Sequence, residues 1–169
     1  VTTNALPEPL ALEDWGSELG LGQGNFPVRR YDDAFGADGF YCYIPESGWA
    51  KTSTEADLGS QGHWEWSSSY GSGSVFTIDR FTGPVEDQFT VAAEQGFVTT
   101  MGTGAIWQRE GDGLRERYYF YSGKDESCSW RIWLRWQPDS LERSGDPNVA
   151  IEPQVMERMA ESFRLAGEA

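Results

Sequence analysis

His63 is the only histidine of the 169-residue chain, so any imidazole chemistry must be built on this one ring. A multi-histidine metal centre is therefore excluded, and a one-histidine site remains. Glu65 follows two residues later, and in an extended strand both side chains point to the same face. If the segment YGSG forms a four-residue hairpin loop, His63 faces Arg80 on the next strand and Glu65 lies diagonal to Arg80. We favour a structural cross-strand ion pair over a functional site made by His63 and Glu65.

The 27 Asp and Glu residues give a weaker signal for a site. A carboxylate pair for glycoside hydrolysis needs a defined separation, which the sequence does not specify. The run DDAFGADG, with Asp32, Asp33 and Asp38, lacks the spacing of a calcium loop, and we favour a solvated acidic loop. The segments GLGQG and MGTGA lack the Lys and Ser/Thr of a phosphate loop and are interpreted as turns. We therefore assign no catalytic residue, no metal site and no cofactor.

The eight tryptophans are the compositional feature that most suggests binding. In SCSWRIWLRWQ, residues 127–137, strict alternation predicts a strand with one strongly apolar face. Trp133 lies on the other face, between Arg131 and Arg135. In the favoured interpretation a helix covers this face and Trp133 packs beneath it, with the arginine stems helping to cover the ring. In the other interpretation the face is open, and Trp133, Arg131 and Arg135 bind a sugar or a protein partner. These three residues are the candidate binding residues.

The two cysteines have the same strand parity. Cys42 alternates with Phe40 and Ile44 in FYCYI, and Cys128 lies on the apolar side of the tryptophan-rich segment. Because both sulfurs point to an apolar face, we expect a Cys42–Cys128 disulfide, with two reduced core cysteines as the alternative. Such a disulfide would indicate an oxidising, extracytoplasmic compartment.

Length and charge restrict the class of protein. A chain of 169 residues is long enough for one compact core. A net charge of −14 argues against binding to nucleic acid or to anionic membrane surfaces. No run approaches the roughly 18 apolar residues of a transmembrane helix, so none is predicted. The opening VTTNALPEPLALED resembles the polar lead-in that remains when a signal or membrane anchor is removed, although a cytoplasmic chain with an irregular start would look alike.

The pattern of elements predicts one α+β domain. Residues 1–38 are rich in Gly, Pro and acidic side chains and are expected to form an irregular lead-in or linker packed on the body. Residues 39–169 are expected to form an antiparallel β-sheet of about six or seven strands covered by helices, with a C-terminal helix packed on the sheet. Strands are predicted at 39–44, 63–69 and 74–81 and three or four times within 97–137, and helices after Pro84 and Pro153 with a loop around 139–148.

The dipeptide Asp112-Gly113 predicts the tightest turn of the sheet. Its composition is typical of a two-residue type I′ hairpin loop. This loop sets Glu110 opposite Arg115 and Trp107 opposite Tyr118, so that a charge pair and an aromatic pair support the same register. The final helix has one apolar stripe, made of Val155, Met156, Met159, Ala160 and Phe163.

The order of these elements resembles the PsbP-like domains of extracytoplasmic proteins and bacterial lipoproteins. The resemblance lies in YIPESGW, which ends the first predicted strand, and in ESFRL, which closes the final helix, and it spans roughly residues 39–165. It implies a central antiparallel sheet covered by helices, in a fold used mostly for assembly and binding rather than catalysis. It carries over no catalytic residue.

These observations favour an extracytoplasmic, non-enzymatic binding or assembly module that is tethered to the cell envelope, with an upstream membrane anchor as one means of attachment. Its expected partner is another envelope protein or a cell-wall component. The alternative is a carbohydrate-active domain that binds sugars, or hydrolyses them weakly, through surface aromatics and carboxylates. A sugar site needs two or more exposed aromatic rings that line a groove near Asp or Glu, whereas a protein-binding module needs a flatter apolar patch.

Overall fold

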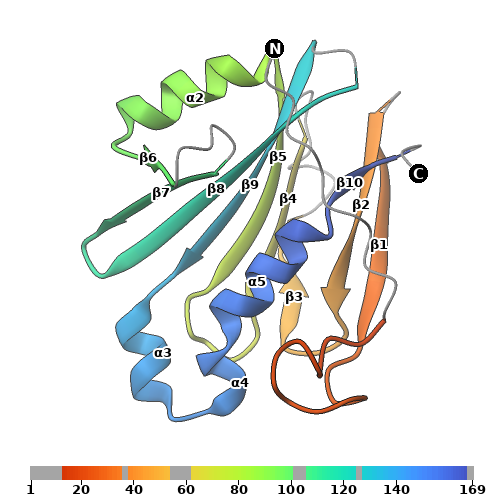
Figure 1. Ribbon diagram of the computed structural model, residues 1–169, viewed down its shortest axis with the longest axis vertical. Coiled ribbons are helices and arrows are strands. Elements are labelled where there is room, and N and C mark those ends of the chain that lie inside the picture. Colours follow the sequence, from red (N-terminus) through yellow and green to blue (C-terminus); the bar gives the residue numbers. More distant parts are fainter. Residues whose placement is uncertain (1–12, 36–37, 54–61, 101–105, 125–126, 167–169) are drawn as a thin grey trace.

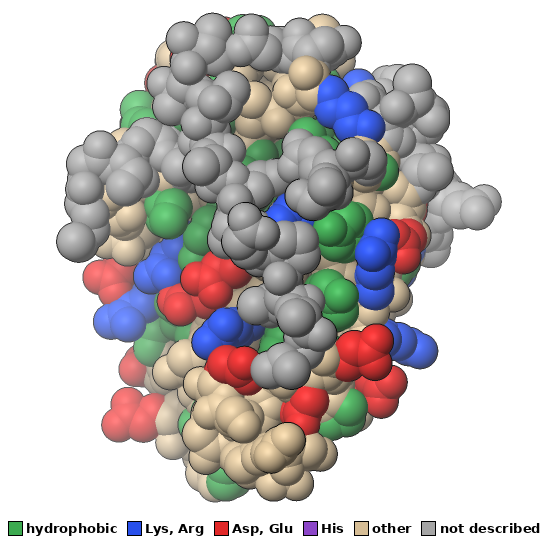
Figure 2. Space-filling model, turned by 45° about the vertical axis from the view of Figure 1, so that its right-hand side comes forward, with side chains coloured by type: hydrophobic (Ala, Val, Ile, Leu, Met, Phe, Trp, Pro, Cys, Tyr) green, Lys and Arg blue, Asp and Glu red, His purple; other side chains and the backbone are tan. Residues whose placement is uncertain are grey.

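Two antiparallel β-sheets and the helices packed against them make up the structure, so the predicted α+β class is confirmed (Figure 1). The computed structural model describes residues 13–35, 38–53, 62–100, 106–124 and 127–166. Acidic and basic side chains are interspersed across the middle of the face shown in Figure 2, whereas the lowest part of that view is mostly uncharged.

The larger sheet has seven antiparallel strands in the order β3-β4-β5-β9-β8-β7-β6, in agreement with the six or seven predicted. β9 lies at its centre, between β5 and β8. Both edge strands are short, with three residues in β3 and two in β6. The strands are β3 (Trp49–Lys51), β4 (His63–Ser68), β5 (Val75–Thr82), β6 (Val98–Thr99), β7 (Ile106–Gly111), β8 (Leu114–Ser122) and β9 (Cys128–Trp136).

The smaller sheet has the order β1-β2-β10, with β1 at Val28–Phe35, β2 at Asp38–Pro45 and β10 at Arg164–Leu165. The prediction that residues 1–38 are irregular is wrong for β1, whose eight residues all pair with β2. β1 is an edge strand with a run of charged residues, VRRYDDAF, so it lacks the apolar alternation by which the other strands were predicted.

The helices cover both faces of the larger sheet. α2 (Val85–Glu94) packs on β8 and β9, and α5 (Glu152–Glu161) contacts both β9 and β2, where the two sheets meet (Figure 1). Residues 139–148 do not form the predicted loop, because α3 (Pro138–Ser144) and α4 (Pro147–Ala150) occupy this segment. Each of these two short helices has a proline in its first turn, a position at which the ring's fixed φ favours a helix start.

Aromatic rings join the two sheets in the main core. The Phe40 ring of β2 lies 4.8 Å from the Trp64 ring and 5.5 Å from the rings of both Trp130 and Phe163, measured between centroids. Phe163 comes after Ser162, the C-cap of α5, and it is fully buried. The predicted apolar stripe of the final helix is thus confirmed as the surface that packs against the sheets. Its members Val155, Met156, Met159, Ala160 and Phe163 are all buried.

The hairpin at Asp112-Gly113 forms as predicted. Both residues have a positive φ, 54° for Asp112 and 75° for Gly113, as a type I′ turn requires. Glu110 pairs with Arg115 in the β7–β8 register and forms an ion pair with it. Trp107 pairs with Tyr118 in the same register, so the prediction from turn chemistry is confirmed.

The predicted Cys42–Cys128 disulfide is wrong, because the two cysteines form no disulfide. Both thiols are buried, as their parity predicted, but Cys42 belongs to the smaller sheet and Cys128 to the larger one. The sulfur of Cys128 lies against Gly123, where an added Cβ would be only 2.2 Å away. Burial raises the pKa of the Cys42 thiol far above its ordinary value. Parity therefore identified the face of each cysteine but not the distance between them.

The cysteines provide the first test of the fold. Iodoacetamide should modify neither thiol in the native protein, because both are buried and the raised pKa of Cys42 keeps that thiol protonated at neutral pH. Both should react after unfolding in denaturant without reductant, and mass spectrometry counts the added groups. Unfolded protein that still resists alkylation until a reductant is added would contain the disulfide.

Phe163 provides a test of the junction between the sheets. Phe163→Ala is expected to lower the free energy of unfolding by about 3–5 kcal/mol, because it removes a fully buried ring that stacks on Tyr121 and Phe40. Val98→Ala is the control, since Val98 is 61% exposed and should change stability by less than about 0.5 kcal/mol. Urea titrations measure both values. A loss below about 1 kcal/mol for Phe163→Ala would mean that this segment is peripheral to the core.

Candidate functional site

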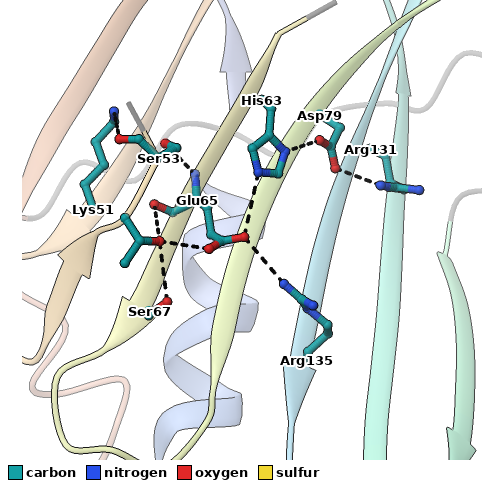
Figure 3. A network of polar contacts seen from close by, with 9 residues as sticks. Lys51, Ser53, His63, Glu65, Ser67, Asp79, Arg131 and Arg135 are labelled. Carbon is teal, nitrogen blue, oxygen red and sulfur yellow. Dashed lines mark hydrogen bonds and ion pairs between the residues drawn. The ribbon is translucent and has the colours of Figure 1, made fainter. Parts of the chain in front are cut away.

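A polar network lies on the face of the larger sheet opposite α5, with side chains from β4, β5 and β9 (Figure 3). Its first row crosses three strands from His63 to Asp79 and then to Arg131. His63 Nδ1 lies 2.5 Å from Oδ1 of Asp79, and Arg131 donates a 2.8 Å hydrogen bond to Oδ2 of the same carboxylate. The side chains of Asp79 and Arg131 are only 12% and 14% exposed, so this ion pair is weakly screened by solvent.

The predicted partner of His63 is wrong, since His63 lies opposite Asp79 and not opposite Arg80. Ser67 pairs with Val75, and the Ser68 N–H donates a hydrogen bond to the Ser74 carbonyl, so the loop has the five residues 69–73 and not the four of YGSG. A shift of one residue exchanges the two faces of a strand, and it brings Asp79 into the network in place of Arg80. Asp79 is the network residue that the sequence analysis missed. It is identified by the pairing of β5 with β9, which sets Asp79 beside Arg131.

Glu65 connects this row to the next. Its Oε1 lies 3.7 Å from His63 Nε2 and 3.6 Å from a terminal nitrogen of Arg135, and its Oε2 accepts a 2.9 Å hydrogen bond from the Thr52 hydroxyl (Figure 3). The contact with Arg135 is an ion pair longer than a good hydrogen bond. Glu65 and Arg135 are 29% and 27% exposed, more than Asp79 and Arg131 beside them. Water and ligands therefore reach this part of the network more readily.

Trp133 lies between the two arginines of β9, as the alternation predicted. The centre of the Arg135 guanidinium is 4.0 Å from the centroid of the indole, and that of Arg131 is 5.1 Å away. The indole N–H donates a 3.0 Å hydrogen bond to Glu116, and the ring meets Tyr118 edge to face at 5.8 Å. The structure thus brings together the three candidate binding residues and orients the ring between them.

Helix α2 covers only part of this face. Beneath it lies a second apolar cluster, which includes Tyr118 and Phe120 of β8, and half-buried Trp133 packs at the margin of that cluster. Burial raises the pKa of the Tyr118 phenol. Glu116 is 5% exposed and accepts two hydrogen bonds from Arg109, which anchors the acceptor of the Trp133 indole. The favoured interpretation, in which a helix covers the face and Trp133 packs beneath it, therefore holds for the side of Trp133 that faces β8.

Three polar atoms in the network lack partners among the described residues: the Thr77 hydroxyl and the buried Nε atoms of Arg131 and Arg135. Thr77 is fully buried, and in the register it lies between Glu65 and Trp133, yet its hydroxyl makes no hydrogen bond. The buried Nε of Arg135 is also without a hydrogen bond. Buried polar groups in native proteins are nearly always bonded, so such groups point to a place where water or a ligand completes the structure.

The His63–Asp79 pair fixes what the imidazole can do. With Asp79 as the acceptor, the Nδ1 position carries a proton and Nε2 is left to face Glu65. An imidazole held in this way can exchange a proton, donate a hydrogen bond when charged, or ligate a cation through Nε2. Within the described ranges, no group of three or more His, Cys, Asp or Glu side chains is placed to hold a metal ion.

The acidic run and the glycine-rich segments singled out in the sequence form no binding site among the described residues. Asp32 and Asp33 lie in strand β1 and not in an acidic loop; Asp32 pairs with Arg30, and Asp33 accepts a 2.7 Å hydrogen bond from the buried Trp64 indole. The side chain of Asp38 lies outside the described part of the chain, as does MGTGA at residues 101–105. The GLGQG segment forms turns with glycines at positive φ, as predicted.

Comparison with models of known protein families gives no match, and a search of curated proteins finds no match to the sequence either. The functional argument therefore depends on the site itself.

The two arginines of the network should differ in their effect on stability. Arg131→Ala removes the guanidinium from a largely buried carboxylate, which then keeps only its contact with His63, and it is expected to cost about 3 kcal/mol, as breaking a largely buried ion pair does. Arg135→Ala removes a longer and more exposed ion pair and should cost about 1 kcal/mol or less. Urea denaturation followed by fluorescence compares the two variants. Equal losses would mean that both arginines are equivalent structural residues.

Proposed function

We propose that this protein is a non-enzymatic binding or assembly module, located outside the cytoplasm and tethered to the cell envelope. It binds its partner, another envelope protein or a cell-wall component, through the sheet face around Trp133. In this proposal Trp133 supplies the contact surface and Arg135 supplies hydrogen-bond donors. Arg131 is a positioning residue, which acts through its ion pair with Asp79.

One observation carries the proposal: a half-buried indole lies against two guanidinium groups, at 4.0 Å and 5.1 Å, beside the part of the face that α2 covers. Trp and Arg are the residue types that most often dominate binding energies at protein interfaces. The ring is already oriented by its hydrogen bond to Glu116, and Arg131 is held by Asp79. A surface that is ordered before binding loses little conformational entropy when it binds.

Arg135 indicates the chemistry of the ligand. Its ion pair with Glu65 is 3.6 Å long, and its Nε has no hydrogen bond among the described residues. A planar guanidinium prefers to bind a carboxylate through two parallel hydrogen bonds. A carboxylate of the partner would bind the Arg135 guanidinium at a shorter distance than Glu65 does. His63, when it is charged, would donate a second hydrogen bond to that carboxylate. We therefore expect acidic groups of a cell-wall polymer or of an envelope protein to bind here.

The location is supported by the resemblance to PsbP-like domains. The wrong prediction of a disulfide removes the second argument for an extracytoplasmic compartment. Among the helices of the described ranges, none is long and apolar enough to cross a bilayer. Attachment to the envelope is therefore proposed through a segment or partner other than these helices.

Arg135→Ala tests the proposed surface. The variant should bind at least about tenfold more weakly than the wild type to purified cell-wall polymer, or to solubilised envelope proteins, from the organism that encodes the chain. Arg143→Ala is the matched control, because Arg143 is an exposed residue of α3, and it should bind like the wild type. Soluble polyglutamate should compete with the natural partner for wild-type protein. Co-sedimentation measures binding to the cell-wall polymer, and surface plasmon resonance measures binding to the envelope proteins. Equal binding by the wild type and Arg135→Ala in both measurements would refute the proposal.

A further inference from the structure

We infer that the protein has a second binding site, for a neutral sugar ring, in a hollow lined by residues of the segment before β1, the start of β3, the β4–β5 hairpin and α4, elements that lie toward the lower end of Figure 1. The hollow has a volume of about 140 Å³. Its walls include three aromatic side chains from separate segments, Phe26 before β1, Trp49 at the start of β3 and Tyr70 in the β4–β5 hairpin. This site is separate from the network around Trp133 and does not depend on it.

The aromatic rings are held in place before any ligand binds. Phe26 stacks on the fully buried Trp15, with a centroid distance of 6.3 Å and an interplanar angle of 9°. Tyr70 is 46% exposed and lies across Gly48, where an added Cβ would be 3.0 Å from its ring. Gly48 has a φ of +86°, so a side chain there is disfavoured by both the backbone and the ring. The main chain of Trp49 is fixed by the pairing of β3 with β4, and its half-buried side chain packs against the main core.

The rim of the hollow offers uncharged donors and acceptors. The side-chain amide of Asn25 donates a 2.7 Å hydrogen bond to the Leu21 carbonyl, which leaves its Oδ1 available as an acceptor. Asn148 lies on the opposite element, α4, and is exposed. The backbone N–H of Asn148 donates to Asp146, but in the part of the chain that the structure describes neither the Asn148 side-chain amide nor the Trp49 indole N–H is engaged in a hydrogen bond. Sugar hydroxyls, which donate and accept, match this set.

The hollow meets the aromatic part of the criterion for a sugar site but has no Asp or Glu in its described lining, and this combination indicates a neutral sugar that is bound by stacking and by uncharged hydrogen-bonding groups. The chain carries 40 Asp, Glu, Lys and Arg residues (27 acidic and 13 basic), yet none of the described residues that line the hollow is charged. The C–H face of a pyranose is weakly positive and apolar, and it complements the negative face of Trp or Tyr. Hydrolysis of a glycoside needs two carboxylates at the bond, and the lining supplies neither. The site is therefore one for binding sugar without cleaving it.

The size of the hollow indicates how much of the ligand it holds. Sites that enclose drug-sized ligands have roughly 300–1,000 Å³, and this hollow is smaller. It accommodates one ring of a glycan, with the neighbouring rings outside. A proline-rich peptide is the competing ligand, because aromatic grooves also bind polyproline helices. Such helices are bound along several successive turns, whereas this is one short hollow.

The test uses the whole chain and three probes, the neutral trisaccharides N-acetylchitotriose and cellotriose and a decaproline peptide. At least one trisaccharide should bind saturably in NMR titrations, and Tyr70→Ala and Trp49→Ala should each weaken this binding about tenfold. Asn148→Ala should weaken it as well. Val98→Ala and Arg135→Ala should leave it unchanged, so that failure of this site is distinguishable from failure of the network around Trp133.

Three outcomes would overturn the inference. Neither trisaccharide binds at concentrations up to about 10 mM, or sugar binding survives in both Tyr70→Ala and Trp49→Ala, or decaproline binds in place of the sugars with the same dependence on these residues. Circular dichroism and thermal melting confirm that each variant is folded. Tyr70 and Asn148 are both exposed, so their variants keep the test decisive if Trp49→Ala does not fold.

Discussion

The two-sidedness of β9 is the constraint on which the rest of the structure depends. This strand is hydrogen-bonded to β5 and β8 at the centre of the sheet, so it has no freedom to shift alone. Its even-numbered residues, such as Trp130 and Leu134, are fully buried in the main core, and its odd-numbered residues Arg131, Trp133 and Arg135 form the opposite face. A slip of one residue would bury the charges and expose the core rings. The same alternation therefore sets both the core and the candidate binding surface.

The burial of its charged groups divides that surface into two parts. One part contains ion pairs with mostly buried carboxylates, and the other, around Arg135, is more exposed. The pairs Arg131–Asp79 and Arg109–Glu116 have mostly buried carboxylates, and an unpaired charge at such a depth is strongly destabilising. These pairs must form whenever the sheet forms, so they hold Trp133 from two sides. Arg135 differs because its carboxylate partner is distant and more exposed. The Arg135 ion pair is the longer and more exposed one, so Arg135 is the arginine to which the proposal assigns recognition.

Sequence patterns predicted local structure well and spatial relations poorly. The alternation of β9, the Asp112-Gly113 turn and the stripe of α5 are properties of neighbouring residues, and all three are confirmed. The facing of His63 depended on the length of one hairpin loop, and an error of one residue replaced Asp79 by Arg80. The proposed cysteine pair depended on two strands lying in one sheet, which parity does not determine. The aromatic hollow joins Phe26, Trp49 and Tyr70 across long sequence separations, and no periodicity connects them.

The edges of the sheets have a consequence for self-association. An unpaired strand edge is a template on which another chain can add a strand, and long apolar edges lead to aggregation. In the larger sheet the edge strands β3 and β6 have only three and two residues, too few for a stable ladder between molecules. The longer edge, β1, carries Arg29, Arg30, Asp32 and Asp33, and charged side chains on an edge strand hinder the apolar packing that aggregation requires. A chain that contains many buried tryptophans thus presents strand edges that discourage polymerisation.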